Sequence, residues 1–229
     1  LTPNYLIAKL KNKIIRVNTS IDGVFSINPK TGKFTSPPIE IGFRDYINRI
    51  YDQKTVEKLY MQQVSIIKAL PELKDYFEIP KYIDSKKIQE INLWVGPGGN
   101  TSPLHYDLSN NFFIQLYGSK KFLLYSPAEF YNLYPNSCFS QTPHISKILI
   151  DSNTNNYPKL QKVKPIEIII SPGEMLFLPA YWWHQVYSID TTISVNIWCT
   201  PLLKQHFVVG VFHTLLHHSY YLLKSLISK

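Results

Sequence analysis

Cysteine, arginine and long apolar runs are all scarce in this sequence. Two cysteines, Cys138 and Cys199, without a C-x-x-C pair exclude a disulfide scaffold and a zinc ribbon, and they predict an intracellular protein, cytoplasmic or nuclear. Only 3 of the 24 basic residues are arginine, and the lysines are spread along the chain, so nucleic-acid binding is not expected despite a net charge of +8. No apolar run approaches the roughly 18 residues of a membrane-spanning helix, so the chain is not expected to cross a membrane.

Several catalytic signatures are missing as well. The glycine-rich turn Gly96–Asn100 is not followed by the lysine and helix of a phosphate-binding loop, and no G-x-S-x-G nucleophile motif occurs. His213 and His217 have a spacing that can hold a metal on a helix, but the glutamate of a zinc-protease helix is not between them. These absences argue against nucleotide binding, serine hydrolysis and zinc proteolysis. Since the first residue is Leu1 and not methionine, it stays open whether further residues precede it.

The chain does contain enough apolar residues for a large core. Of its 229 residues, 45% are apolar and 14% are aromatic, which predicts a folded domain. From residue 88 onward apolar residues alternate with a period of two, and turn signals such as Pro172-Gly173 separate the segments. Eight strands are predicted here, at residues 91–95, 104–107, 111–117, 121–125, 166–170, 174–178, 185–189 and 192–199. Many short strands without helices between them predict an antiparallel barrel or sandwich, a mainly β fold.

Residues 1–200 are predicted to form one domain, with a β core at residues 88–200 and a flanking part at residues 1–87. The flanking part mixes both kinds of periodicity. Its predicted elements are strands at residues 13–17 and 57–64 and short helices at residues 43–51 and 71–77.

Two further segments have their own character. Residues 132–164 are polar and poor in periodicity, and a loop of that length is expected to be a lid or a binding loop, with His144 a solvated loop residue. Residues 201–229 turn helical, although Gly210 argues against one continuous helix, and the histidines there are expected on a polar helix face. The many large apolar side chains of this segment predict either packing on the sheet or a homodimer through the C-terminal helices.

The residues that suggest chemistry are His105, Asp107 and His184. On a strand, positions i and i+2 face the same side, so His105 and Asp107 project together. Two histidines and one carboxylate, with the opposite face open, are the ligand set of non-haem Fe(II) oxygenases. A single H-x-D motif is common by chance, and ordinary half-buried histidines remain the alternative interpretation on spacing alone.

Several motifs around these residues favour the Fe(II) site over ordinary half-buried histidines. They are Gly99–Asp107, Asn111–Phe113, Gly118–Lys121, Pro172–Pro179, Tyr181–His184 and Ser194–Trp198, preceded by Leu59–Gln63. With these motifs the stretch from Asn92 to Trp198 resembles the JmjC and cupin-like 2-oxoglutarate oxygenases. It is most similar to the small JmjC protein hydroxylases, which include the asparaginyl hydroxylase that inhibits hypoxia-inducible factor. The resemblance implies a double-stranded β-helix (jelly roll, cupin) with N-terminal flanking elements and C-terminal helices.

The resemblance also implies roles for individual residues. The ligands of Fe(II) would be His105, Asp107 and His184. The distal carboxylate of the co-substrate 2-oxoglutarate would be bound by Lys120, with hydroxyl groups from Tyr60 and Ser102. The other residues lining the pocket would be Asn111, Asn196, Trp94, Phe113 and Val186, with Trp198 and Gln62 on the substrate side. Ser102 stands where the closest family members carry threonine, which keeps the hydroxyl group.

The function implied is hydroxylation of a protein or peptide side chain, with conversion of 2-oxoglutarate and O2 to succinate and CO2. Demethylation of N-methyl-lysine and hydroxylation of a tRNA base are alternatives within the same family. A catalytically silent cupin-like binding module is the alternative from another class, and it is disfavoured because all three metal ligands and the co-substrate lysine are present. Substrate identity is left open, because the long segment that shapes substrate choice matches only loosely.

Overall fold

The computed structural model describes the chain apart from residues 53–56, 77, 149–153, 202–207 and 228–229. Strands β1 to β11 are, in order, Ile14–Ser20, Ile39–Gly42, Lys58–Ser65, Ile88–Gly96, Thr101–Tyr106, Asn110–Tyr117, Lys120–Tyr125, Ile166–Ile170, Met175–Leu178, Trp183–Ser188 and Thr192–Cys199. Helices α1 to α4 are Pro3–Leu10, Phe43–Tyr51, Ile66–Ala69 and Val208–Ile227. The 3-10 helices η1 to η5 are Pro71–Tyr76, Ser85–Lys87, Pro127–Leu133, Thr154–Asn156 and Leu160–Lys162.

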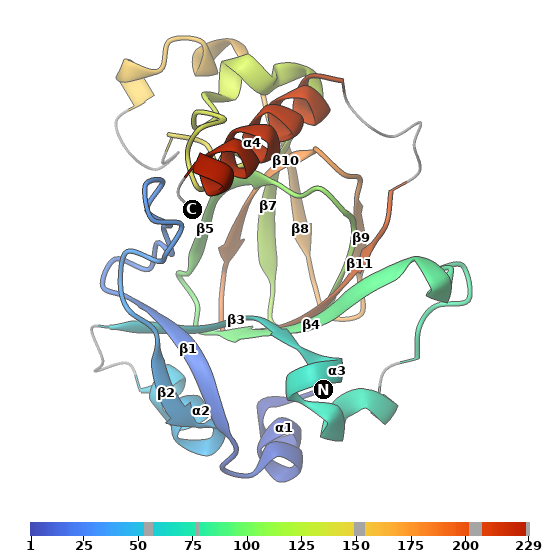
Figure 1. Cartoon of the computed structure of the whole chain (residues 1–229). Coiled ribbons are helices and arrows are strands. Elements are labelled where there is room, and N and C mark those ends of the chain that lie inside the picture. Colours follow the sequence, from blue (N-terminus) through green and yellow to red (C-terminus); the bar gives the residue numbers. More distant parts are fainter. Residues whose placement is uncertain (53–56, 77, 149–153, 202–207, 228–229) are drawn as a thin grey trace.

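Two antiparallel sheets form the centre of the molecule (Figure 1). The larger sheet has seven strands in the order β2-β1-β3-β4-β11-β6-β9, and the smaller has four in the order β5-β10-β7-β8. The chain crosses between the sheets, since β4 and β6 belong to one and β5 and β7 to the other. This is the arrangement of a jelly roll, so the predicted mainly β fold and its eight core strands are confirmed.

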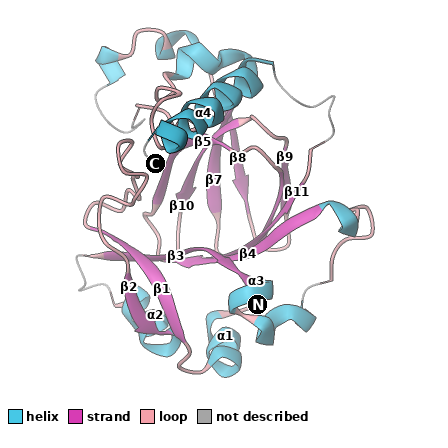
Figure 2. Ribbon diagram, viewed as in Figure 1, coloured by secondary structure: helices cyan, strands magenta, loops and turns pink. Residues whose placement is uncertain are grey.

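The larger sheet is apolar on the face that is turned away from the smaller sheet. Figure 2 shows α1, α2 and α3 on this face. Leu6 of α1 and Phe43 and Tyr46 of α2 are fully buried there against the strands, including Leu93 and Val195. Each such side chain contributes roughly 1.5–3 kcal/mol by leaving water. The helices therefore seal one face of the sheet and leave its other face free to line an interior space.

The first 87 residues do more than flank the core, because β1, β2 and β3 extend the larger sheet next to β4. The predicted helix at residues 43–51 and the strands near residues 13–17 and 57–64 are confirmed. The segment predicted as a helix at residues 71–77 is a 3-10 helix to Tyr76, and residue 77 lies outside the described part. Sequence periodicity did not predict α1, whose start is marked by the cap Thr2 and by Pro3 in the first turn.

Two irregular segments cover the free edge of β5. The backbone N–H of Thr101 donates to the carbonyl oxygen of Gly23, and Phe25 N–H donates to Thr101. Further along the strand, Ser146 N–H donates to Leu104, and Tyr106 N–H donates to the carbonyl oxygen at residue 144. These bonds satisfy backbone groups that an edge strand would otherwise expose.

The long segment at residues 132–164, which was predicted as a lid or a binding loop, contributes side chains to a hydrophobic core. Leu133, Ile148 and Leu160 are buried in a core on the outer face of the smaller sheet, where they pack with Trp183 and Tyr106. Residues 149–153 of this segment lie outside the described part. In the described part of the segment, Leu133 and Leu160 are buried near its two ends. His144 and Ile145 are the residues of this part that line the cavity between the sheets.

In the described part of the C-terminal segment α4 runs without a break through Gly210, so the prediction that Gly210 interrupts the helix was wrong. Glycine is tolerated because the helix passes close to Tyr181: a Cβ atom at this position would lie 2.6 Å from Tyr181 Cδ1. The inner face of α4 is fixed by two hydrogen bonds, from Tyr221 Oη to the carbonyl oxygen of Phe139 and between His217 Nδ1 and the carbonyl oxygen of Cys138. Of the other histidines assigned to a polar face, His206 lies outside the described part. Within the described residues, no helix combines the length and hydropathy needed to span a membrane.

Candidate active site

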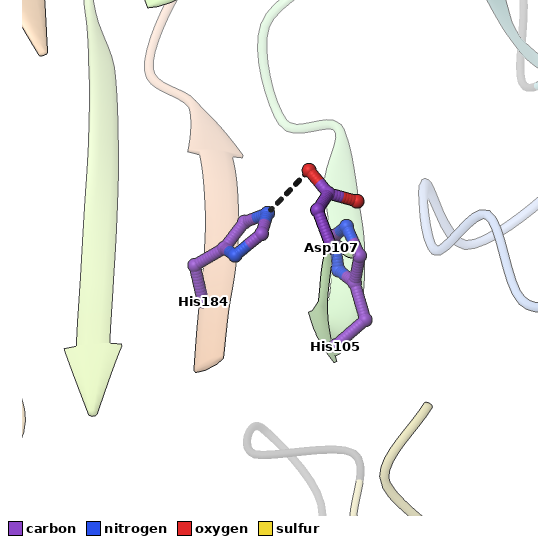
Figure 3. A group of neighbouring side chains, drawn as sticks. All are labelled: His105, Asp107 and His184. Carbon is purple, nitrogen blue, oxygen red and sulfur yellow. Dashed lines mark ion pairs between the residues drawn. The ribbon is translucent and has the colours of Figure 1, made fainter. Parts of the chain in front are cut away.

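Three side chains with metal-binding atoms meet between β5 and β10 (Figure 3). His105 on β5 lies directly opposite His184 on β10 in the antiparallel register, and Asp107 follows β5 at once. The two imidazole rings have centroids 4.2 Å apart, and His184 Nε2 is 3.8 Å from Asp107 Oδ2. One ligand atom from each residue lies within 4.8 Å of the other two. The predicted convergence of these three residues is confirmed.

Each histidine is oriented by a hydrogen bond from its Nδ1 to the carbonyl oxygen two residues earlier in the chain. His105 Nδ1 lies 2.7 Å from the carbonyl oxygen of Pro103, and His184 Nδ1 lies 3.0 Å from the carbonyl oxygen of Trp182. A carbonyl oxygen only accepts hydrogen bonds, so each Nδ1 carries the proton and each Nε2 keeps its lone pair. Burial and the neighbouring His105 lower the pKa of His184 to about 4, which keeps its ring in the neutral form that binds metals.

This donor set fits a divalent metal ion. Two neutral nitrogens and one carboxylate would hold the ion as a facial triad, and all three residues line one cavity. That combination is typical of Fe(II) sites that bind a co-substrate and O2, whereas structural zinc sites close all four positions with protein ligands.

The cavity beside the triad has a volume of about 320 Å³ and ends at a buried lysine. Lys120 is 1% exposed, and its Nζ donates to Tyr60 Oη over 2.8 Å. Aromatic rings surround it, with the centroids of Phe113 and Trp94 5.1 and 6.0 Å from Nζ. Among the described residues no carboxylate pairs with Lys120. Burial lowers its pKa to about 7. A buried cation without an anion at the end of a cavity is a site for an anionic ligand.

The structure places most of the predicted site residues around this one cavity. Its lining includes Tyr60, Gln62, Trp94, Ser102, His105, Asp107, Asn111, Phe113, Lys120, His184, Val186 and Trp198. Asn196 differs from the prediction, because it does not line the cavity. It lies one layer behind the wall, fully buried between Trp94 and Asn111.

No sequence pattern predicts the residues that line the cavity from irregular segments. Phe25, Ile27 and Phe34 reach it from the turn-rich stretch between β1 and β2, and Ile145 reaches it from the long segment after β7. His144 also lines the cavity, so the expectation of a solvated loop histidine was wrong: burial lowers its pKa to about 4. Neither periodicity nor a motif marks these residues, because tertiary contacts alone bring them here.

A bulge in β3 adds one more lining residue. The pairing of β3 with β4 shifts between Met61 and Val64, and Gln63 has a positive φ of 53°. Bulges break the alternation of a strand, so two consecutive side chains, Gln62 and Gln63, both reach the cavity. Residues held in this backbone region cluster at functional sites.

Two histidines on paired jelly-roll strands and the carboxylate that follows one of them, in a cavity that is also lined by a buried lysine, match a cupin-type metal site. The family described as "Cupin-like domain" matches residues 3–204, and the chain belongs to this family. Curated relatives carry JmjC names. Jumonji C domain-containing protein 5 of Drosophila melanogaster is 33% identical in an alignment of 186 positions that covers 70% of this chain and 46% of that protein.

Two further relatives differ in the activity that their names state. Lysine-specific demethylase 8 of Xenopus tropicalis is 37% identical over 144 residues, 61% of this chain and 32% of that protein. The 2-oxoglutarate and iron-dependent oxygenase JMJD4 of Mus musculus is 34% identical in an alignment of 185 positions that covers 71% of this chain and 42% of that protein. The chain thus spans about a third to a half of the length of these relatives.

Proposed function

We propose that this protein is an oxygenase that uses Fe(II) and 2-oxoglutarate. The observation that carries the proposal is one cavity with a facial triad at one place and a buried, unpaired lysine at another. A dicarboxylate is the ligand that matches both, because one end can reach the metal while the distal carboxylate pairs with Lys120. The name of the mouse relative, an oxygenase dependent on 2-oxoglutarate and iron, supports this assignment.

The chain's own residues would divide the work as follows. His105, Asp107 and His184 would hold the iron. Lys120 would bind the distal carboxylate, with the hydroxyl groups of Tyr60 and Ser102 as further hydrogen-bond partners. When bound, iron and 2-oxoglutarate supply the activation of O2 that oxidises a C–H bond, with succinate and CO2 as products.

Apolar side chains would keep this chemistry dry. Phe113 and Val186 line the cavity from β6 and β10, and Phe25 and Phe34 line it from the segment between β1 and β2. Water excluded from the cavity can neither compete for the metal nor quench a reactive oxidant, so these side chains protect the reaction without taking part in it.

We propose a protein or peptide side chain as the substrate and hydroxylation as the outcome. Once the co-substrate occupies the deep end of a cavity of about 320 Å³, the remaining space suits a single side chain. Trp198 and Gln62 would contact it. Demethylation of N-methyl-lysine, hydroxylation of a tRNA base, and a silent binding module are the competing functions. A reducing compartment, the cytoplasm or nucleus, fits the two free cysteines Cys138 and Cys199.

A turnover assay distinguishes these functions. We expect the protein with Fe(II), 2-oxoglutarate and O2 to release succinate slowly without substrate, and faster with peptides that it modifies. Mass spectrometry of a peptide library and of tRNA then shows the product, as a gain of one oxygen for hydroxylation or the loss of a methyl group for demethylation. Absence of succinate with iron demonstrably bound would leave only the binding module.

We also propose that α4 pairs with a second copy of the chain. The outward face of α4 carries large apolar side chains that are 36–64% exposed, at helical spacing: Phe212, Leu215, Leu216, Tyr220, Leu222, Leu223 and Leu226. Contiguous exposed apolar side chains of this kind often mark a protein–protein interaction site. Lys224 is the only charged residue in α4. Two chains that each carry a net charge of +8 repel each other least if they meet through an uncharged face. The small side chain of Ser219 lies among these apolar residues and would allow two helices to cross closely there.

Size-exclusion chromatography with light scattering tests the pairing. We expect the mass of a dimer for the wild type and of a monomer for Leu222→Glu, because the substitution places a charge in the interface. Ile14→Glu is the control, since Ile14 is 62% exposed on β1, which Figure 1 shows at the opposite end of the molecule from α4, and it should remain dimeric. A monomeric wild type at micromolar concentration contradicts the proposal.

A further inference from the structure

A line of hydrogen bonds crosses the larger sheet beneath the cavity and ends at a candidate metal ligand. Trp94 Nε1 on β4 donates to Asn196 Oδ1 on β11 over 2.7 Å. Asn196 Nδ2 donates to Asn111 Oδ1 on β6 over 3.1 Å, and Asn111 Nδ2 lies 3.4 Å from Asp107 Oδ2. In the strand register these residues are diagonal neighbours, since Trp94 pairs with Ser194 and Asn111 with Trp198. Side chains of this length reach across such diagonals.

The direction of this line follows from its first member. An indole N–H can only donate, so Asn196 must present its oxygen to Trp94 and its NH2 group to Asn111. Asn111 must then accept with its oxygen, which leaves its own NH2 group for the carboxylate of Asp107. One indole therefore fixes the orientation of two amides that could otherwise be turned by 180° at little cost.

Burial protects the hydrogen bonds of this line from water. Asn196 is 0% exposed and Asn111 is 5% exposed, so water does not compete for their amide groups. In such surroundings hydrogen bonds are stronger, and successive bonds polarise one another. The carboxylate of Asp107 thus receives an N–H group from β6 whose orientation is set by Trp94 on β4, two strands away in the larger sheet.

We infer that Asn196 is a positioning residue for Asp107, acting through Asn111, and that Trp94 sets the polarity of the line. The inference rests on the proposed function, in which Asp107 holds the metal. Outer groups that hydrogen-bond a ligand orient it, and their removal typically lowers metal affinity by about 10- to 100-fold. This gives Asn196 a task that differs from lining the cavity.

Metal binding to the whole chain tests the inference without reference to turnover. Titration with Co(II), followed by its absorbance and by calorimetry, is expected to show affinity about 10- to 100-fold lower in Asn196→Ala than in the wild type. Asn92→Ala is the matched control. Asn92 pairs with Asn196 across β4 and β11 and is 1% exposed, but no described hydrogen bond connects it to the line. Thermal unfolding of both variants measures any general loss of stability.

Trp94→Phe gives a second test that alters the fold less. It keeps an aromatic ring in the cavity wall and removes the N–H group together with the pyrrole half of the indole, so the amides lose the donor that fixes their direction. We expect Co(II) affinity to fall in the order wild type, Trp94→Phe, Asn196→Ala. Wild-type affinity in Asn196→Ala, or an equal loss in Asn92→Ala, overturns the inference and leaves the proposed function standing. A wild type that binds no Co(II) overturns both.

Discussion

Replacing Asp107 with alanine is expected to abolish Fe(II) binding and, with it, all turnover of 2-oxoglutarate. The variant retains two neutral imidazoles and no anionic ligand, so the dipositive ion loses both a bond and its only charge partner in the triad. The loss should exceed the roughly 10- to 100-fold effect of removing a group that merely orients a ligand. His105→Ala should behave alike, because its Nε2 is one of the two imidazole donors. Succinate release and calorimetric Fe(II) titration under argon measure the two effects.

Two exposed residues provide the matched controls for these variants. Asp75→Ala and His218→Ala remove the same side chains from η1 and from α4, and both should bind iron and release succinate as the wild type does. Thermal unfolding shows whether each variant is folded. If Asp107→Ala is folded and still forms succinate at the wild-type rate, the triad is not the metal site and the oxygenase assignment fails.

The second large effect concerns Lys120. Lys120→Met keeps the apolar stem and removes the ammonium group, so a bound carboxylate would lie in a buried site without a counter-ion. Removing one partner of a buried charge pair costs about 2–5 kcal/mol, on the order of 30- to 5,000-fold in affinity. We expect 2-oxoglutarate to bind more weakly by that factor and Fe(II) to bind unchanged. Lys121→Met is the control, because the next residue on β7 points to the other side, over the ring of Tyr187.

The pH dependence of binding gives Lys120 a distinct signature. Burial lowers the pKa of Lys120 to about 7 when no carboxylate is bound, so above pH 7 the lysine is mostly neutral. A bound carboxylate favours the charged form and raises this pKa, so binding takes up a proton and affinity falls as the pH rises above 7. Calorimetry in two buffers of different ionisation enthalpy measures the proton uptake. Its persistence in Lys120→Met, or full wild-type affinity in that variant, would show that another group binds the carboxylate.

The sequence predicted those parts of the site that regular strands carry. His105 and Asp107 share a face because the side chains of a strand repeat every two residues, and the period was readable from residue 88 onward. The strand bearing His184 was recognisable in the same way. The pairing of β5 with β10 could not be derived from local pattern, but the order of the motifs implied it.

The rest of the site depends on contacts that no local pattern encodes. Phe34 and His144 lie in irregular segments, whose paths are set by the elements to which they bond. Asn196 was predicted to line the cavity, but its side chain lies behind the lining residues Trp94 and Asn111. A motif shows which residue is present, and it does not show whether the side chain reaches the cavity. The prediction that Gly210 interrupts the helix was wrong for a related reason. The entropic cost of glycine in a helix can be read from the sequence, whereas its close approach to Tyr181 is a tertiary contact.

The cover over β5 sets a lower limit on the size of any working fragment. β5 carries His105 and leads directly into Asp107, and the start of its outer edge is bonded to residues 23–25, which precede it by more than seventy positions. A truncation that begins after Phe25 would keep all three ligands but bare that edge, which invites strands of other molecules to add to it. The ligands alone therefore do not delimit the catalytic unit: a shortened version has to start ahead of Gly23 to stay monodisperse.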